Sequence, residues 1–88
     1  MATTTKDGEI FGAHLRALRL ARGLTQPQLA ERCDSNVPFI SNVERGVMLP
    51  GLAMLLRLAA ALECDVSKLV EVFDGKSRRA TKTRTRRS

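Results

Sequence analysis

Two strong helix-start signals that lie only eleven residues apart constrain this chain more than any other feature. The first is the segment TQPQ at residues 25–28, whose threonine and second glutamine match the two halves of a capping box and whose proline falls in the first helical turn. The second is Asn36, a favoured N-cap residue, which is followed by Pro38 in the next first turn. The helix that starts after Thr25 is therefore expected to end near Cys33, which leaves the polar residues 34–36 as a very short turn.

Three further segments carry apolar residues at the spacing of three to four that marks one face of a helix. No segment shows sustained strand-like alternation, so the sequence predicts an all-α fold of five short helices. Gly23 is expected to end the first helix in the left-handed conformation, and Gly46 is the stop of the third. The predicted helices cover about residues 9–22, 26–33, 37–45, 52–62 and 66–73.

Length and composition limit the class of protein. The chain has 88 residues, of which 43% are hydrophobic and 27% charged, and this suits one small globular domain. No apolar run approaches the roughly 20 residues of a membrane span, and the N-terminus has no apolar signal region, so we expect a cytoplasmic protein without membrane contact. Cys33 and Cys64 match neither a disulfide framework nor a metal-binding spacing and are interpreted as small buried residues.

Positive charge is concentrated at the C-terminal end of the chain. Residues 75–88 contain seven Lys or Arg, no acid and no large apolar residue, whereas residues 1–74 contain eight basic and nine acidic residues. A segment without apolar side chains cannot offset its ordering entropy. We therefore expect a flexible N-terminus over 1–8, a folded domain over 9–74 and a disordered basic tail over 75–88. The tail either attracts phosphates or only aids solubility.

Two helices joined by a three-residue turn form a helix-turn-helix, and this geometry suits DNA. The second helix can enter a major groove about 12 Å wide, while the first lies across the backbone with its N-terminal amides toward phosphate. On spacing alone the signal is moderately specific, because any helical hairpin can imitate it.

The residues at fixed positions make the signal more specific. The chain from about 10 to 73 closely resembles the Cro/CI-type (XRE-like) helix-turn-helix family, and within it most resembles the controller proteins of restriction–modification systems. The resemblance implies a compact five-helix fold like that of lambda repressor. Arg19 matches the arginine of the family's first helix. The other matching residues are Leu24-Thr25-Gln26, Leu29-Ala30, Ile40-Ser41, Glu44-Arg45-Gly46, Pro50, Leu52 and Ala59-Ala60-Ala61-Leu62.

The resemblance also implies site residues, position by position. Base-reading positions fall on Val37, Pro38, Ser41 and Asn42, and DNA-backbone positions on Thr25, Gln26 and Arg45, with Asn36 either a backbone contact or only a cap. Asn42 can pair bidentately with adenine, although it could also be a solvated helix residue. Val37 and Pro38 stand where the family commonly has Gln, Arg or Thr, which favours contact with thymine methyls and readout of DNA shape. Phe39 belongs either to this groove-facing surface or to the core.

Arg19 and Glu44 match the family's structural ion pair between the first and third helices. The last two predicted helices offer more apolar surface than one small face can bury, which suggests a partner. A twofold homodimer would place two reading helices about 34 Å apart, in successive major grooves of DNA. We expect its interface to include Val70, Val72 and Phe73.

Together these features predict a sequence-specific transcriptional regulator, a repressor or controller that binds a palindromic operator on double-stranded DNA as a homodimer. The alternative is an antitoxin-like interaction module that neutralises a partner protein. The sequence has no Ser-His-Asp or Cys-His constellation and no phosphate-binding glycine loop, so an enzyme is not expected. Neither a cofactor, a metal ion nor a small-molecule ligand is expected.

Overall fold

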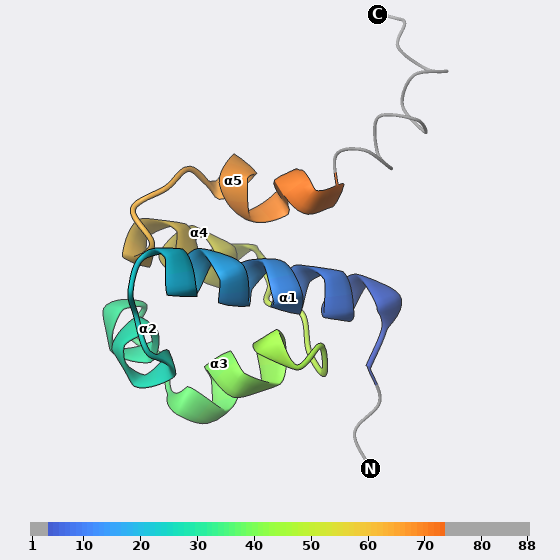
Figure 1. Cartoon of the computed structure of the whole chain (residues 1–88), viewed down its shortest axis with the longest axis horizontal. Helices are drawn as coiled ribbons and strands as arrows, with labels where there is room; N and C mark the ends of the chain where they lie inside the picture. Colours follow the sequence, from blue (N-terminus) through green and yellow to red (C-terminus); the bar gives the residue numbers. More distant parts are fainter. Residues whose placement is uncertain (1–3, 74–88) are drawn as a thin grey trace, which may run out of the picture.

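Five α-helices and one 3₁₀ turn lie within residues 4–73, which are the residues that this computed structural model describes (Figure 1). No strand occurs in that range, so the predicted all-α fold is confirmed. The basic tail predicted over 75–88 lies outside the described residues. In chain order the elements are α1 (Lys6–Ala21), α2 (Gln26–Arg32), α3 (Val37–Glu44), α4 (Leu52–Ala61), α5 (Val66–Val70) and the 3₁₀ turn η1 (Glu71–Phe73).

The side-chain caps predicted for α2 and α3 are both present. Thr25 Oγ1 accepts from the Gln28 amide at 3.2 Å, and Gln28 Oε1 accepts from the Thr25 amide at 2.8 Å, which completes the capping box. Asn36 Oδ1 accepts from the Phe39 amide at 2.9 Å. Each of these bonds satisfies an amide that a helix N-terminus leaves without an intrahelical partner. The starts of both helices are therefore fixed by their own local sequence.

The first helix begins earlier than predicted. It starts at Lys6 rather than at Glu9, because Thr5 Oγ1 accepts from the Gly8 amide at 2.9 Å and caps the helix there. Asp7 and Glu9 lie in this first turn, where carboxylates are stabilised by the positive end of the helix dipole. Residues 6–8 are thus helical and do not belong to the flexible segment expected over 1–8.

The last predicted helix is divided in two. Instead of one helix over 66–73, α5 ends at Val70 and the chain continues as the 3₁₀ turn Glu71–Phe73. Such tightened turns are frequent at helix C-termini, where the last carbonyls lack helical partners. The remaining predicted helix ends agree with the structure to within one residue.

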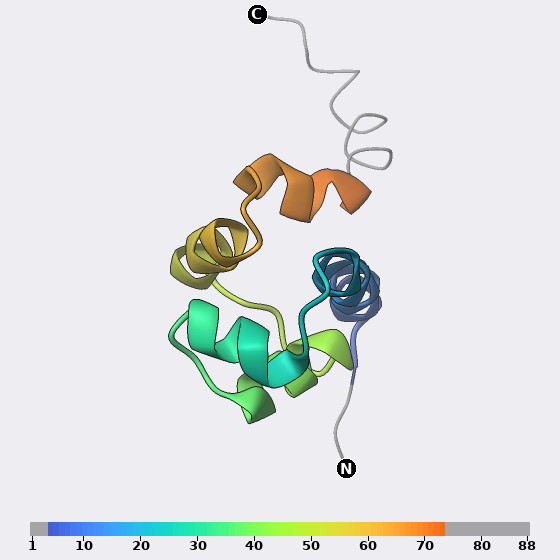
Figure 2. The same ribbon diagram turned by 60° about the vertical axis from the view of Figure 1, so that its left-hand side comes forward.

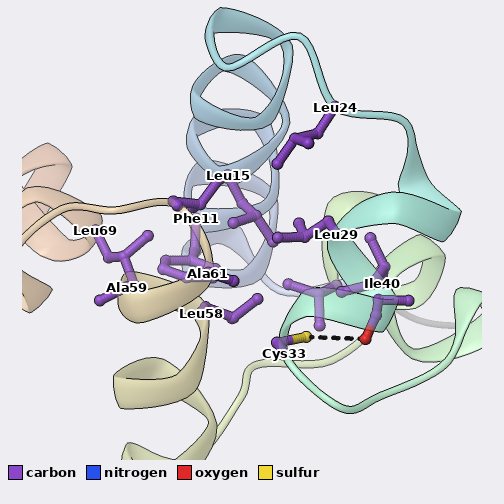
Figure 3. Close-up of a cluster of buried hydrophobic side chains, with 13 residues drawn as sticks. Phe11, Leu15, Leu24, Leu29, Cys33, Ile40, Leu58, Ala59, Ala61 and Leu69 are labelled. Atoms are coloured by element: carbon purple, nitrogen blue, oxygen red, sulfur yellow. Dashed lines mark hydrogen bonds between the residues drawn. The ribbon is translucent and has the colours of Figure 1, made fainter.

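All five helices contribute to one hydrophobic core (Figure 3). In both Figure 1 and Figure 2, α3 and α5 lie on opposite sides of α1. Helix α3, which carries the predicted base-reading residues, therefore lies at one edge of the molecule. None of the described helices has the length and apolar character needed to cross a membrane. The side chains without any exposed surface come from every helix and are Leu15, Leu29, Ile40, Val43, Leu58 and Leu69.

The two cysteines differ in burial. Cys33 is 2% exposed and belongs to the core, as predicted, whereas Cys64 is only half-buried beside it. Both are free thiols. Burial raises the pKa of the Cys33 thiol and of the Cys64 thiol above the ordinary value, because a low-dielectric surrounding disfavours the thiolate.

Candidate nucleic-acid interface

The connection between α2 and α3 is as short as predicted. Asp34 has a φ of 58°, in the left-handed region, which a short polar side chain tolerates better than most. The Ser35 amide then donates to the Ala30 carbonyl at 2.8 Å, which closes the turn against α2. Asn36 follows at once as the cap of α3. The turn therefore joins two helices without any intervening loop.

The two faces of α3 differ in exposure. Ile40 and Val43 have no exposed surface, and Phe39 is partly buried and packs against the core. Phe39 therefore lies with the core rather than with the groove-facing residues. The opposite face turns outward and carries the four residues predicted to read bases, of which two are exposed and two half-buried: Val37, Pro38, Ser41 and Asn42.

Asn42 and Arg45 are linked on this outward face. Arg45 Nη2 donates to Asn42 Oδ1 at 2.5 Å across one turn of the helix. The contact orients the Asn42 carboxamide but uses only one lone pair of its oxygen, and a carboxamide oxygen has two. Asn42 therefore keeps acceptor capacity at its oxygen, and its NH₂ group supplies two donors.

Two of the predicted backbone-contact residues are exposed and serve as caps. Thr25 and Asn36 each use a side-chain oxygen to accept from the helix that follows. The Thr25 hydroxyl and the Asn36 NH₂ group still carry hydrogens that can be donated to an anion. The cap role and a phosphate contact are therefore chemically compatible at both positions.

The C-terminal end of α3 is held by a buried ion pair. Arg19 Nε donates to Glu44 Oε2 at 2.7 Å and Arg19 Nη2 donates to Glu44 Oε1 at 3.1 Å, as the family resemblance implied. Gln26 Nε2 adds a third donor to Glu44 Oε1 at 3.0 Å, and Arg19 Nη1 donates to the Leu24 carbonyl at 2.8 Å. This network joins α1, the start of α2 and the end of α3. Gln26 was predicted to contact the DNA backbone, and no local sequence signal indicates that its side chain also forms a hydrogen bond with Glu44.

Other arginines are engaged in contacts within the domain. Arg57 on α4 donates to the Cys33 carbonyl at 3.0 Å and to the Asp34 carbonyl at 2.6 Å, which caps the end of α2. Arg22 and Arg32 both lie within 4 Å of the Glu63 carboxylate. The folded domain therefore uses much of its positive charge internally.

The apolar surface is distributed differently from the prediction. Val70 and Phe73 are partly buried and pack against the chain's own core, while Val72 is 38% exposed. The most exposed large apolar side chains lie on α4, where Leu52 is 68% and Leu56 is 53% exposed. The uncovered apolar surface of the described residues is thus centred more on α4 than on α5.

Comparison with known proteins agrees with this geometry. A family model described as "Helix-turn-helix domain" matches residues 10–72. The chain belongs to the helix-turn-helix domain family. The predicted similarity to Cro/CI-type (XRE-like) regulators and to restriction–modification controllers is also confirmed, because both kinds of protein occur among the matches.

Three matches illustrate the range of this helix-turn-helix domain. This chain is 37% identical over 59 residues to the immunity repressor protein of Bacillus phage phi105, a match that covers 67% of this chain but only 41% of the repressor. The controller protein C.AhdI from Aeromonas hydrophila superposes with a TM-score of 0.72 at 37% identity, covering 74% of this chain and 98% of the controller. The P22 c2 repressor, solved in complex with a synthetic operator, superposes with a TM-score of 0.63 at 30% identity, covering 67% of this chain and 89% of the repressor.

Proposed function

We propose that this chain is a sequence-specific DNA-binding transcriptional regulator, a repressor or controller, and that α3 is its reading helix. The observation that carries the proposal is the contrast between the two faces of α3. One face is closed into the core through Ile40 and Val43, and the other presents polar and small apolar side chains to solvent. A major groove about 12 Å wide admits a helix presented in this way.

The outward side chains suit particular base edges. Asn42 offers an acceptor and donors that match the N6 donor and N7 acceptor of adenine, and Arg45 holds its carboxamide in place. Ser41 can donate or accept, so it tolerates several bases. Val37 and Pro38 have no hydrogen-bonding side-chain atoms and suit thymine methyl groups and sugars. The expected operator therefore contains A·T pairs at the positions that α3 faces.

Phosphate contacts are assigned to the edge of this surface. Thr25 and Asn36 lie exposed at the starts of α2 and α3, and Arg45 lies exposed at the end of α3. The Gln26 NH₂ group uses one hydrogen for Glu44 and keeps a second for a phosphate. These four residues would fix the register of α3 on the duplex without reading its sequence.

The basic tail supplies most of the long-range attraction in this proposal. Residues 1–74 carry one more acidic than basic residue, and several of the folded domain's arginines are occupied by internal contacts. Residues 75–88 carry seven basic residues and no acid. Such a segment attracts a phosphate backbone regardless of base sequence.

We propose a homodimer as the DNA-binding form. A second copy would cover the apolar side chains that the monomer leaves exposed, namely Leu52 and Leu56 on α4 together with Val72. Val70 and Phe73 would then support this interface from their partly buried positions. Two reading helices related by a twofold axis match two half-sites of a palindromic operator about 34 Å apart.

In-vitro selection from a random duplex pool tests the proposed function. We expect the full chain to enrich an inverted repeat with A·T pairs in each half-site. Enrichment of no sequence over the starting pool would overturn the proposal, because a reading helix must prefer some duplex.

The exposed leucines of α4 also fit a second candidate function, an antitoxin-like module whose apolar surface covers a different protein. This candidate predicts that the purified chain stays monomeric and forms a stoichiometric complex with that protein. A homodimer that dissociates when α4 is altered would count against it, since the same leucines would already be covered.

A further inference from the structure

Helix α1 contains two buried glycines spaced by one helical turn. Gly8 and Gly12 both lie inside the helix, where glycine is unfavourable compared with alanine because it loses more backbone freedom. Neither residue has a positive φ, so backbone conformation does not require glycine at these positions. Their absence of a side chain therefore needs another explanation.

The explanation is the close approach of α3. A Cβ atom on Gly12 would lie 2.3 Å from the Val43 carbonyl oxygen and 2.6 Å from the Glu44 carbonyl oxygen. A Cβ atom on Gly8 would lie 2.6 Å from the Gly46 carbonyl oxygen. These atoms belong to the backbone, which cannot rotate away as a flexible side chain can. A methyl group on Gly12 must therefore push the end of α3 away from α1, and one on Gly8 must push away Gly46, which directly follows the C-cap of α3.

The contact is equally tight in the other direction. Gly46 follows α3 with a φ of 83°, and a Cβ atom there would lie 2.9 Å from Glu9 Cγ and 3.0 Å from Glu9 Cα. The first two turns of α1 and the end of α3 are thus fitted backbone to backbone. Arg19 and Glu44 clamp the same end of α3 from further along α1.

This anchoring leaves the two ends of α3 in different situations. Its C-terminal end is seated on α1, whereas its N-terminal residues Val37 and Pro38 lie exposed at the edge of the molecule. The helix has eight residues and is about 12 Å long, so a displacement at the seated end changes the depth and tilt of the whole outward face.

We propose that Gly8 and Gly12 are positioning residues that set how far α3 projects and thereby determine sequence discrimination. This inference rests on the proposed function of α3 as the reading helix. It predicts that filling either position reduces the preference for specific DNA by more than the accompanying loss of stability explains.

The test compares alanine variants of four glycines in the full chain. Gly12→Ala fills the contact with the end of α3, and Gly8→Ala fills the contact with Gly46 just after it. Gly23→Ala is the matched destabilising control, because Gly23 has a φ of 71° but a methyl group there would meet no atom within 4 Å, so the strain stays local. Gly51→Ala is the mild control, since Gly51 has a φ of −77° and equally open space, so only its preference as the N-cap of α4 is lost.

The readout is the ratio of the Kd for random duplex to the Kd for the selected duplex at one salt concentration, with thermal unfolding measured in parallel. Gly8→Ala and Gly12→Ala should each lower this ratio about tenfold, the loss typical of one misread base pair. Gly23→Ala should lower the unfolding temperature yet keep the ratio within about twofold of wild type. If Gly12→Ala does not fold, Gly8→Ala, at the milder contact near the helix start, decides.

A folded Gly8→Ala variant with the wild-type ratio would overturn the inference, and so would an equal loss of the ratio in Gly23→Ala. Failure of the proposed function looks different, because the wild-type chain itself would then show no preference for any duplex. The two failures are therefore separable within one set of measurements.

Discussion

The guanidinium of Arg19 and the carboxylate of Glu44 meet through two parallel hydrogen bonds, of 2.7 and 3.1 Å, with side chains only 8% and 3% exposed. The pair links the last turn of α1 to the last residue of α3, and Gln26 donates to the same carboxylate from α2. Bidentate geometry fixes direction as well as distance. The orientation of α3 therefore depends on one polar network rather than on apolar packing alone.

Removing one partner of this network should be costly. Glu44→Gln leaves the buried Arg19 charge without its counter-charge, and breaking a buried pair in this way costs about 3–5 kcal/mol of the free energy of unfolding. Urea unfolding of the full chain measures the loss. Glu63→Gln is the matched control, because the Glu63 side chain is 68% exposed beside Arg22 and Arg32. Its substitution should lower the free energy of unfolding by at most about 1 kcal/mol. Equal losses in the two variants would contradict the structural role given to Glu44.

Self-association should depend on α4. Leu56→Glu places a charge on the surface that a second copy is proposed to cover, so sedimentation velocity at high micromolar concentration should change from dimer to monomer. Leu20→Glu is the matched control, because Leu20 on α1 is 52% exposed and Leu56 53%. A monomeric wild-type chain would contradict the proposed homodimer. Dissociation by Val72→Glu but not by Leu56→Glu would place the interface on η1 instead of α4.

The salt dependence of DNA binding should reside in the tail. Replacing the seven basic residues of 75–88 by glutamine keeps the length but removes the charge. The slope of log K against log salt should then fall by about 0.9 for each phosphate that the tail no longer neutralises, while the preferred sequence stays the same. An unchanged slope would exclude the tail from the binding mechanism.

The two thiols should differ in reactivity. Cys33 is 2% exposed and Cys64 half-buried, so an aromatic disulfide reagent should modify Cys64 first in the folded chain and both rapidly in denaturant. Equal rates in the folded chain would contradict the burial of Cys33.

The same thiols predict a loss of stability at alkaline pH. Burial raises the pKa of both in the folded chain above the ordinary value of about 9, so their contribution to stability is complete below that value. It is lost as the pH rises through the folded pKa, because the unfolded chain releases these protons first. Urea midpoints between pH 8 and 10.5 measure the effect, which should be smaller in Cys33→Ala.

Features set by neighbouring residues could be predicted from the sequence. The caps at Thr25 and Asn36 and the left-handed Gly23 depend only on a few adjacent positions, and all three are present. The start of α1 follows the same rule, since Thr5 is a favoured N-cap residue. It was missed because the apolar pattern used to place the helix begins only further along the chain. The ion pair between Arg19 and Glu44 was accessible only through the family resemblance.

Features set by tertiary contact could not be predicted in this way. Gly12 reads as an ordinary weak point of a helix until α3 is seated against it. Phe39 has the same sequence neighbours whether it faces the groove or the core, and only the packing of α3 places it with the core. Val70 and Phe73 likewise looked like surplus apolar surface before the fold showed them partly buried against the core of their own domain.

The central claim is that the outward face of α3 reads bases, and Asn42→Ala tests it most directly. The affinities of wild type and variant are compared on the selected duplex and on random duplex, with Ser67→Ala, an exposed substitution on α5, as the control. We expect a loss of about 1–3 kcal/mol on the selected duplex and almost none on random DNA. An equal loss on both duplexes, or no loss on either, would contradict the claim.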